Sequence, residues 1–139
     1  MSATRTAATR PQIQMIEEEA DKLSNLALDI EAKFPQVSEL LIRETSRAKL
    51  HNASTIPRDV VTMGSFVEFV DEGTGSRRRI QLVYPPDADT SANRISILTP
   101  VGAGLIGLRE GQSILWPDRE GHERRLVIMK VQQLVEPVA

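Results

Sequence analysis

The stretch of sequence that decides the fold is residues 95–107, which read I-S-I-L-T-P-V-G-A-G-L-I-G. Its alternating apolar residues predict a strand over 94–98. Thr99 is suited to cap a short helix that begins at Pro100, because the first turn does not need the N–H that proline lacks. Gly107 can end this helix in the left-handed conformation. The pattern predicts a strand, a Thr-Pro turn, a short helix, a glycine and a further strand.

Three glycines in this stretch have the spacing of a dinucleotide-binding motif. Gly102, Gly104 and Gly107 spell G-x-G-x-x-G directly after the predicted strand. That motif requires a full crossover helix and an acidic residue about 20 residues further on. Only a short helix fits before Gly111, and Asp118 comes too soon. We therefore interpret the glycines as positions where a short helix approaches a sheet closely.

Composition excludes several classes of protein. The chain has 139 residues, a formal net charge of −2 and no cysteine. Strong direct nucleic-acid binding is not expected, because it requires a basic excess. Disulfide scaffolds and thiol catalysis are excluded, and no apolar run is long enough to cross a bilayer. We expect a cytoplasmic monomer without a cofactor, a metal or a membrane partner, with His51 and His122 on its surface.

Towards the N-terminus, apolar residues recur at spacings of three and four. They predict an amphipathic helix, and they are Ile13, Ile16, Ala20, Leu23, Ala27, Ile30 and Phe34. Pro35 interrupts this pattern, and a second helix is expected to start at Ser38. Two such stripes joined by a short loop predict an antiparallel helical hairpin, a short coiled coil, over 11–52. Residues 1–10 are expected to form a disordered tail, and 53–58 a linker.

Beyond the linker, the apolar period changes to two. This alternation predicts strands over 66–70, 79–84, 94–98, 113–116 and 124–134. With the one short helix, the chain is expected to be an α+β protein whose second domain, 59–139, is an antiparallel sheet. The hairpin and this domain are expected to be separable, because each has its own periodicity.

Two segments of the second domain together resemble the C-terminal domain of Gre transcription factors. One is 59–65, D-V-V-T-M-G-S, and the other is 95–107, followed by Gly111 and a long last strand. The resemblance implies an FKBP-like fold. The short hairpin with a proline at its tip is similar to the Rnk proteins, Gre-like regulators of nucleoside diphosphate kinase. The resemblance implies binding to RNA polymerase near its secondary channel and modulation of transcription elongation.

The resemblance also implies a docking element. In Gre factors an acid-Ser-Pro triplet before the short helix contacts the polymerase, and the matching positions here are Leu98, Thr99 and Pro100. Thr99 and Pro100 keep the hydroxyl and the turn, whereas Leu98 departs from the acid. Val101 and Gly102 extend the expected docking surface, with the Val101 side chain exposed. The alternative is that Thr99 and Pro100 only cap the helix.

The hairpin tip, Glu31, Phe34 and Pro35, is expected to lack the chemistry of a cleavage factor. Gre factors carry paired carboxylates at the tip, which help to hold a catalytic Mg²⁺ in the polymerase. Here Asp29 and Glu31 are two residues apart on a helix and do not face the same way. The arm is also short, about 27 Å at 1.5 Å per residue. We expect a protein that is not an enzyme and that competes with Gre factors without stimulating transcript cleavage.

Other functions and contacts stay open on the sequence. One alternative is a regulator that acts on nucleoside diphosphate kinase through another surface. Another is a prolyl isomerase, whose pocket would need the aromatic residues Phe66, Phe69, Tyr84 and Trp116. We expect Phe66 and Phe69 to pack in the sheet instead. The run Arg77–Arg79 is interpreted as solvated strand charge, with contact to phosphates or to an acidic partner as the alternative.

Overall fold

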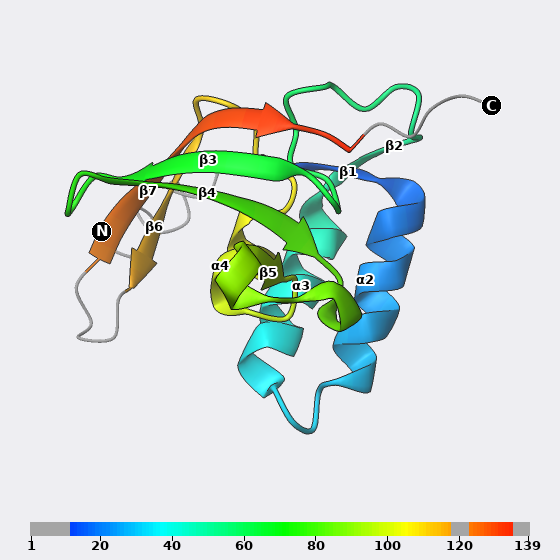
Figure 1. The fold of residues 1–139 in the computed structure, drawn as a ribbon. Coiled ribbons are helices and arrows are strands. Elements are labelled where there is room, and N and C mark those ends of the chain that lie inside the picture. The colour runs from blue at the N-terminus through cyan, green and yellow to red at the C-terminus, as the bar shows by residue number, and fades with distance from the viewer. Residues whose placement is uncertain (1–11, 118–122, 135–139) are drawn as a thin grey trace, which may run out of the picture.

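The computed structural model describes residues 12–117 and 123–134, and it combines a helical hairpin with a five-stranded sheet (Figure 1). The sheet curves over a short helix and over the base of the hairpin, whose tip points away from it. The predicted α+β class is confirmed. The tail expected over 1–10 lies outside the described ranges.

The first helix, α2 (Glu17–Asp29), follows a short strand, β1 (Gln14–Ile16). Three glutamates fill the first turn of α2, where the helix dipole favours negative charge. The predicted apolar stripe is therefore divided between two kinds of structure. Ile13 is buried in the extended segment, whereas Leu23 and Ala27 are buried on the inner face of the helix.

The second helix, α3 (Pro35–Arg47), starts earlier than expected. A start at Ser38 is wrong because Pro35 occupies the first helical turn, where its missing N–H costs no hydrogen bond. Ser38 is buried instead, and its hydroxyl donates to the carbonyl oxygen of Ala27 across the hairpin at 2.7 Å. After α3 the chain forms β2 (Lys49–His51), which pairs with β1 in parallel.

The main sheet has the strand order β5-β4-β3-β7-β6. Its strands are β3 (Phe66–Asp71), β4 (Ser76–Val83), β5 (Arg94–Ser96), β6 (Ser113–Pro117) and β7 (Glu123–Gln132). All neighbours are antiparallel except β4 and β5, so the expectation of a fully antiparallel sheet is wrong at this edge. The connection 84–93, with 3₁₀ turns at Pro85–Asp87 and Thr90–Ala92, returns the chain so that β5 runs in the direction of β4.

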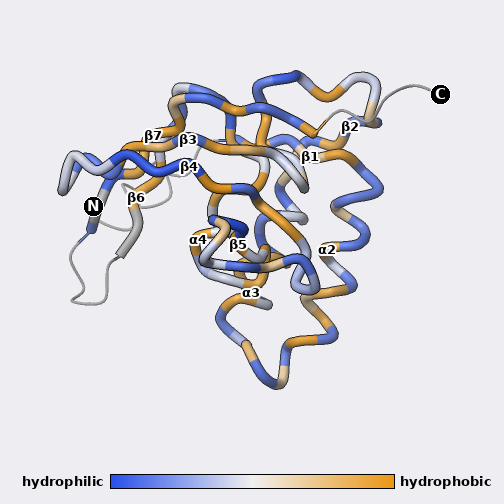
Figure 2. Tube along the Cα trace, viewed as in Figure 1, coloured by the Kyte–Doolittle hydropathy of each residue, from blue (hydrophilic) through white to orange (hydrophobic). Residues whose placement is uncertain are grey.

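One cluster of buried apolar side chains joins the hairpin to the sheet. Leu23 and Leu41 of the hairpin belong to the same cluster as Val67, Leu82 and Leu105. Figure 2 shows hydrophobic stretches of the hairpin and the sheet gathered around α4 (Pro100–Leu105), the short helix that packs on α3. Separability of the two domains stays a prediction. The predicted boundary at residue 59 runs through this cluster, so separating the domains would expose part of it to solvent.

Gly107 is the point where the N-terminal segment meets the end of α4. Its φ of 85° lies in the left-handed region, as predicted for the residue that ends this helix. Its carbonyl oxygen accepts a hydrogen bond from the N–H of Gln14 at 3.1 Å, and its own N–H donates to Val61 at 2.9 Å. A Cβ at this position would lie 2.8 Å from Cβ of Ile13, so only glycine permits the approach.

We predict that Gly107→Ala destabilises the protein more than Gly75→Ala does. Both glycines have a positive φ, 85° and 76°, which costs an L-residue roughly 1–2 kcal/mol. A Cβ at Gly75 meets no atom within 4 Å, whereas one at Gly107 collides with Ile13. Urea unfolding of both variants measures the difference in their free energies of unfolding. This difference reports how closely the N-terminal segment packs on Gly107. Equal losses of unfolding free energy would contradict that packing.

Candidate functional site

The turn between β5 and α4 is held by side-chain hydrogen bonds. The hydroxyl of Thr99 accepts from the N–H of Gly102 at 3.1 Å, which makes Thr99 the N-cap of α4. The same hydroxyl donates to the carbonyl oxygen of Ser96 at 2.8 Å. The hydroxyl of Ser96 accepts from the N–H of Leu98 at 3.0 Å. The predicted cap is confirmed, and the turn presents Pro100 to solvent on a fixed backbone.

The five residues expected to form the docking surface differ in their exposure. Pro100 is exposed, whereas Leu98 and Thr99 are half-buried. Val101 is also half-buried and packs against the core, so the expectation that its side chain projects freely is wrong. Gly102 is buried, and a Cβ there would collide with the carbonyl oxygen of Ser96 in β5. Gly102 thus permits close packing of the short helix on β5, as we interpreted it.

An acidic residue lies beside the turn although Leu98 replaces the expected acid. Asp89 and Thr99 line one open depression of about 380 Å³, together with Arg94 and Ile95. The carboxylate of Asp89 accepts from the hydroxyl of Ser91 at 2.6 Å and from its N–H at 3.0 Å. These hydrogen bonds hold the pKa of Asp89 below its usual range. The depression therefore holds an ionised carboxylate next to the Thr-Pro turn, with the guanidinium of Arg94 in the same lining.

The hairpin tip presents two exposed apolar side chains to solvent. Phe34 and Leu28 are 51% and 60% exposed at this end of the hairpin. Glu31 and Pro35 are exposed as well, and Asp29 ends α2. Within the described residues, no group of three potential acidic, histidine or cysteine ligands could hold a metal ion.

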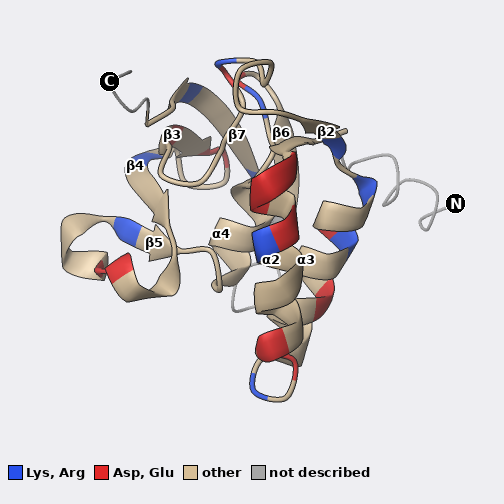
Figure 3. Ribbon diagram, turned by 90° about the vertical axis from the view of Figure 1, so that its right-hand side faces the viewer, with Lys and Arg blue, Asp and Glu red and all other residues tan. Residues whose placement is uncertain are grey.

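The opposite end of α2 is strongly acidic and contacts the second domain (Figure 3). The carboxylate of Glu19 accepts from the N–H of Met63 at 3.0 Å. Burial raises the pKa of Glu19, and the hydrogen bond from Met63 and the charge of Lys22 only partly offset this effect. Burial also raises the pKa of Tyr84, with a further contribution from the Glu19 charge. These groups line a depression of about 390 Å³ between α2 and the sheet.

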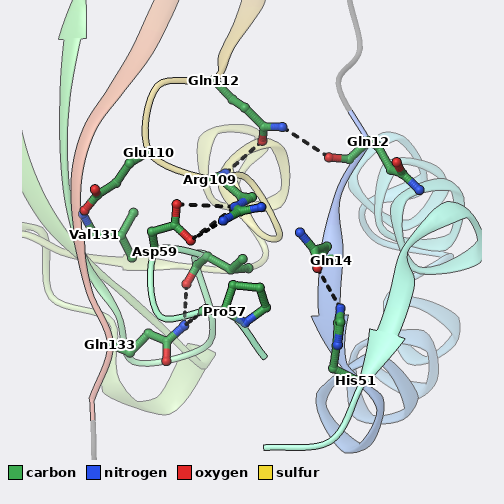
Figure 4. Close-up of polar contacts among 11 residues, drawn as sticks. Gln12, Gln14, His51, Pro57, Asp59, Arg109, Glu110, Gln112, Val131 and Gln133 are labelled. Carbon is green, nitrogen blue, oxygen red and sulfur yellow. Dashed lines mark hydrogen bonds and ion pairs between the residues drawn. The ribbon is translucent and has the colours of Figure 1, made fainter. Parts of the chain in front are cut away.

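A polar network attaches the segment before β3 to the sheet (Figure 4). Asp59 pairs with the guanidinium of Arg109, with Nη2 and Oδ1 3.0 Å apart. Gln133 donates from Nε2 to the carbonyl oxygens of Pro57 and Val60 at 2.8 and 2.9 Å. The start of the segment 59–65, on which the resemblance depends, is thus held by Arg109 through Asp59 and by Gln133 through Val60.

The remaining candidate residues do not converge on one pocket. Phe69 is buried in the core, whereas Phe66 is half-buried beneath the guanidinium of Arg79 on the outer face of the sheet. His51 is half-buried and bonded to Gln14 at 2.6 Å, so its expected surface position is only partly right. His122 lies outside the described residues. No described helix is long and apolar enough to span a membrane.

Known proteins with similar sequence and structure share this architecture. Residues 56–133 match the family described as "Transcription elongation factor, GreA/GreB, C-term". The chain belongs to the GreA/GreB family. It is similar along most of its length to the regulator of nucleoside diphosphate kinase of Escherichia coli K12, with 32% identity over 124 residues, 89% of this chain and 91% of that protein.

Two further relatives place the second domain and the whole fold in this family. A solved structure described as a prokaryotic GreA/GreB elongation factor from Nitrosomonas europaea is 38% identical with a TM-score of 0.71, over 88% of this chain and 98% of that one. Transcription elongation factor GreA of Azorhizobium caulinodans is 42% identical over 69 residues, 50% of this chain and 44% of that protein. This Gre-family chain is therefore similar along most of its length to the Escherichia coli regulator and to the Nitrosomonas europaea structure.

Sequence reasoning missed three features of the site. Asp89 lies in a loop ten residues before Thr99, which gives no signal in the sequence. Only the path of the chain through the 3₁₀ turns brings it into the same depression as Thr99. Glu19 is one of three consecutive acids at the start of α2, a pattern that does not reveal its contact with the N–H of Met63. Glu44 falls on the apolar side of α3, where it is 2% exposed and paired with Arg47 at 2.8 Å. The signal in the sequence was the spacing of three residues between Glu44 and Arg47, which permits an ion pair on a helix.

We predict that the stability contributed by Glu19 falls as pH rises. A carboxyl whose pKa is raised on folding favours the native state when protonated, and this contribution is lost as pH rises through the native pKa. Relative to Glu19→Gln, the natural protein should therefore lose thermal stability between about pH 4 and pH 7. Glu18→Gln controls for the change in net charge on the same turn. A Tm difference between the natural protein and Glu19→Gln that is constant over this range would contradict the burial of Glu19.

Proposed function

We propose that this Gre-family chain is a non-catalytic regulator that binds RNA polymerase near its secondary channel and modulates elongation. It competes with Gre factors for that surface and does not stimulate transcript cleavage. The observation that carries the proposal is the Thr99-Pro100 turn, which is rigid, exposes Pro100 and lies beside an ionised Asp89. Membership of the GreA/GreB family supports the choice of polymerase as partner.

The docking surface is argued from shape and charge at the start of α4. The Gre triplet combines an acid, a hydroxyl residue and a proline, and here the acid position is Leu98. Asp89 lies in the same depression as Thr99 and supplies a carboxylate from a different segment. Its hydrogen bonds to Ser91 keep it charged and oriented. A basic patch on the partner would therefore be recognised despite the departure at Leu98.

The absence of cleavage activity is argued from the arm. Helix α2 has 13 residues, which at 1.5 Å per residue is about 20 Å. This is shorter than the about 27 Å expected for residues 16–33, mainly because α2 ends at Asp29. The tip carries exposed Phe34 and Leu28. Asp29 and Glu31 do not share a helix as expected, because Asp29 ends α2 and Glu31 lies in the turn that follows. A short arm with an apolar tip supports a competitor rather than a cleavage factor.

A regulator of nucleoside diphosphate kinase is the second candidate, because the full-length relative from Escherichia coli bears that name. The two candidates differ in the partner that co-purifies with the protein. Bound polymerase subunits support the first, and bound kinase without polymerase supports the second.

We predict competition without cleavage in stalled elongation complexes. Added alone, the protein should leave the nascent RNA uncut, and in excess it should suppress cleavage by a Gre factor until more Gre factor is added. Asp89→Asn should weaken this suppression several-fold at low salt, because it removes a charge from the docking surface while keeping an acceptor for Ser91. Asp87→Asn, in the neighbouring 3₁₀ turn, is the matched control and should behave like the natural protein.

Two outcomes would contradict this function. Cleavage by the protein alone would overturn the estimate of arm length and the expectation that Asp29 and Glu31 do not act as a pair. Equal suppression by the Asp89→Asn and Asp87→Asn variants would remove Asp89 from the docking surface. Thermal unfolding of each variant confirms that a loss of suppression is not a loss of fold.

A further inference from the structure

We propose that the protein has a second binding surface, at the outer face of the sheet, for an acidic protein segment that carries a large apolar side chain. The site consists of a groove with a mixed apolar and polar lining and a row of cations beside it. It is separate from the Thr99-Pro100 turn, because that turn begins α4, which lies beneath the sheet (Figure 1). It therefore does not depend on how the chain docks on a polymerase.

The groove lies between the end of β7 and the linker before β3, and its volume is about 650 Å³. Its lining, which we call the Phe66 groove, includes Ile56, Arg58, Phe66, Val131, Gln132 and Leu134. Ile56 and Val131 are buried in its floor, whereas Leu134 is 58% exposed at its rim. Although the chain has a net charge of −2, exposed Leu134 and the cation Arg58 line the same groove. This combination fits an amphipathic ligand.

The groove is already formed in the free chain. Gln133 donates to the carbonyl oxygens of Pro57 and Val60 at 2.8 and 2.9 Å, which ties the linker wall to the end of β7. The N–H of Val131 donates to the carboxylate of Glu110 at 2.8 Å. This bond occupies the strand edge at that residue, so an added β-strand cannot use it. A ligand must therefore be held by its side chains, in a groove that needs little ordering on binding.

The cations, which we call the basic row, continue from the groove along the outer face. Arg79 and Lys130 lie on either side of Glu68 in the sheet register, and Arg77 follows along β4. The hydrophilic first half of β4 is visible in Figure 2. Glu68 is 3.9 Å from Arg77 and offsets one of the three positive charges of the row, which leaves a net charge of +2 (three cations less one carboxylate).

The groove and the basic row are physically continuous. A small hollow beside the groove is lined by Glu68, Arg79 and Lys130, and it shares Phe66 and Gln132 with the groove. One extended ligand can therefore place an apolar side chain in the groove and carboxylates on the row. Among the described residues that line these two hollows, Arg58, Arg79 and Lys130 outnumber the acidic residue Glu68.

The chemistry favours a protein segment over single-stranded nucleic acid. Bases bind such surfaces by stacking on free aromatic faces. The guanidinium of Arg79 already lies over the Phe66 ring, 4.7 Å from its centroid. The apolar part of the remaining lining is aliphatic, with Ile56, Val131 and Leu134 beside polar residues such as Gln132 and Gln133. Aliphatic pockets flanked by cations match apolar and acidic side chains of a peptide.

The test is selection of short random peptides displayed on phage against the whole chain. We expect enriched peptides to be acidic and to contain a large apolar residue. A synthetic copy of the most enriched peptide should bind the Arg79→Gln/Lys130→Gln variant at least about tenfold more weakly. Leu134→Ser should also weaken binding several-fold through loss of apolar contact.

Matched variants separate this surface from general effects of charge and exposure. Lys33→Gln/Arg43→Gln removes the same charge from exposed positions of the hairpin and should leave affinity unchanged. Leu28→Ser removes a leucine that is 60% exposed, comparable with the 58% of Leu134, and should also have no effect. Enrichment of non-acidic peptides, or none, would overturn the proposal. So would equal binding by the test and control variants, or an oligouridylate that binds through Arg79 and Lys130 when peptides do not.

Discussion

The approach of the N-terminal segment to Gly107 is the constraint on which the arrangement of this protein depends. The N–H of Gln14 donates to Gly107, and the side chain of Ile13 fills the space where a Cβ would lie. The carbonyl oxygen of Ile13 accepts in turn from the N–H of Lys49, after α3. One glycine thus connects the end of α4 with the strands on both sides of the hairpin. A larger residue there would force the base of the hairpin away from the sheet.

This contact gives the hairpin a defined direction relative to the Thr99-Pro100 turn. Helix α3 packs on α4, and Thr99 caps the other end of α4. Glu19 adds a hydrogen bond from α2 to Met63. The Thr99-Pro100 turn and the base of the arm are therefore joined through α4, α3 and the shared buried cluster. In the proposed function, this arrangement would hold the tip at a fixed place relative to the Thr99-Pro100 turn when that turn binds the polymerase.

Local rules were sufficient for the parts of the structure that short segments determine. The cap at Thr99, the proline at the start of α4 and the left-handed Gly107 follow from residue chemistry alone. Apolar periodicity located both hairpin helices and all five strands of the sheet within a few residues. The resemblance carried by residues 59–65 and 95–107 identified the family.

Contacts between distant segments were not accessible to those rules. The parallel pairing of β1 with β2 involves only three residues on each side, too few to give a periodic signal. The parallel β5 and the position of Asp89 depend on the path of residues 84–93. Phe66 shares its apolar character with Phe69, and only the sheet register shows that it lies on the outer face beneath Arg79. Pro35 was read as an interruption although it also fits the first turn of a helix.

Native-state hydrogen exchange tests most directly whether the hairpin base and the sheet form one packed body. The amide of Gln14, bonded to Gly107, and that of Lys49, bonded to Ile13, report on the base. The central amides of β3 report on the sheet. We predict that both sets exchange with similar opening free energies, because they are buried by the same cluster. Exchange of Gln14 and Lys49 at a much lower opening free energy than β3 would show that the hairpin detaches on its own, and would contradict the fixed arm.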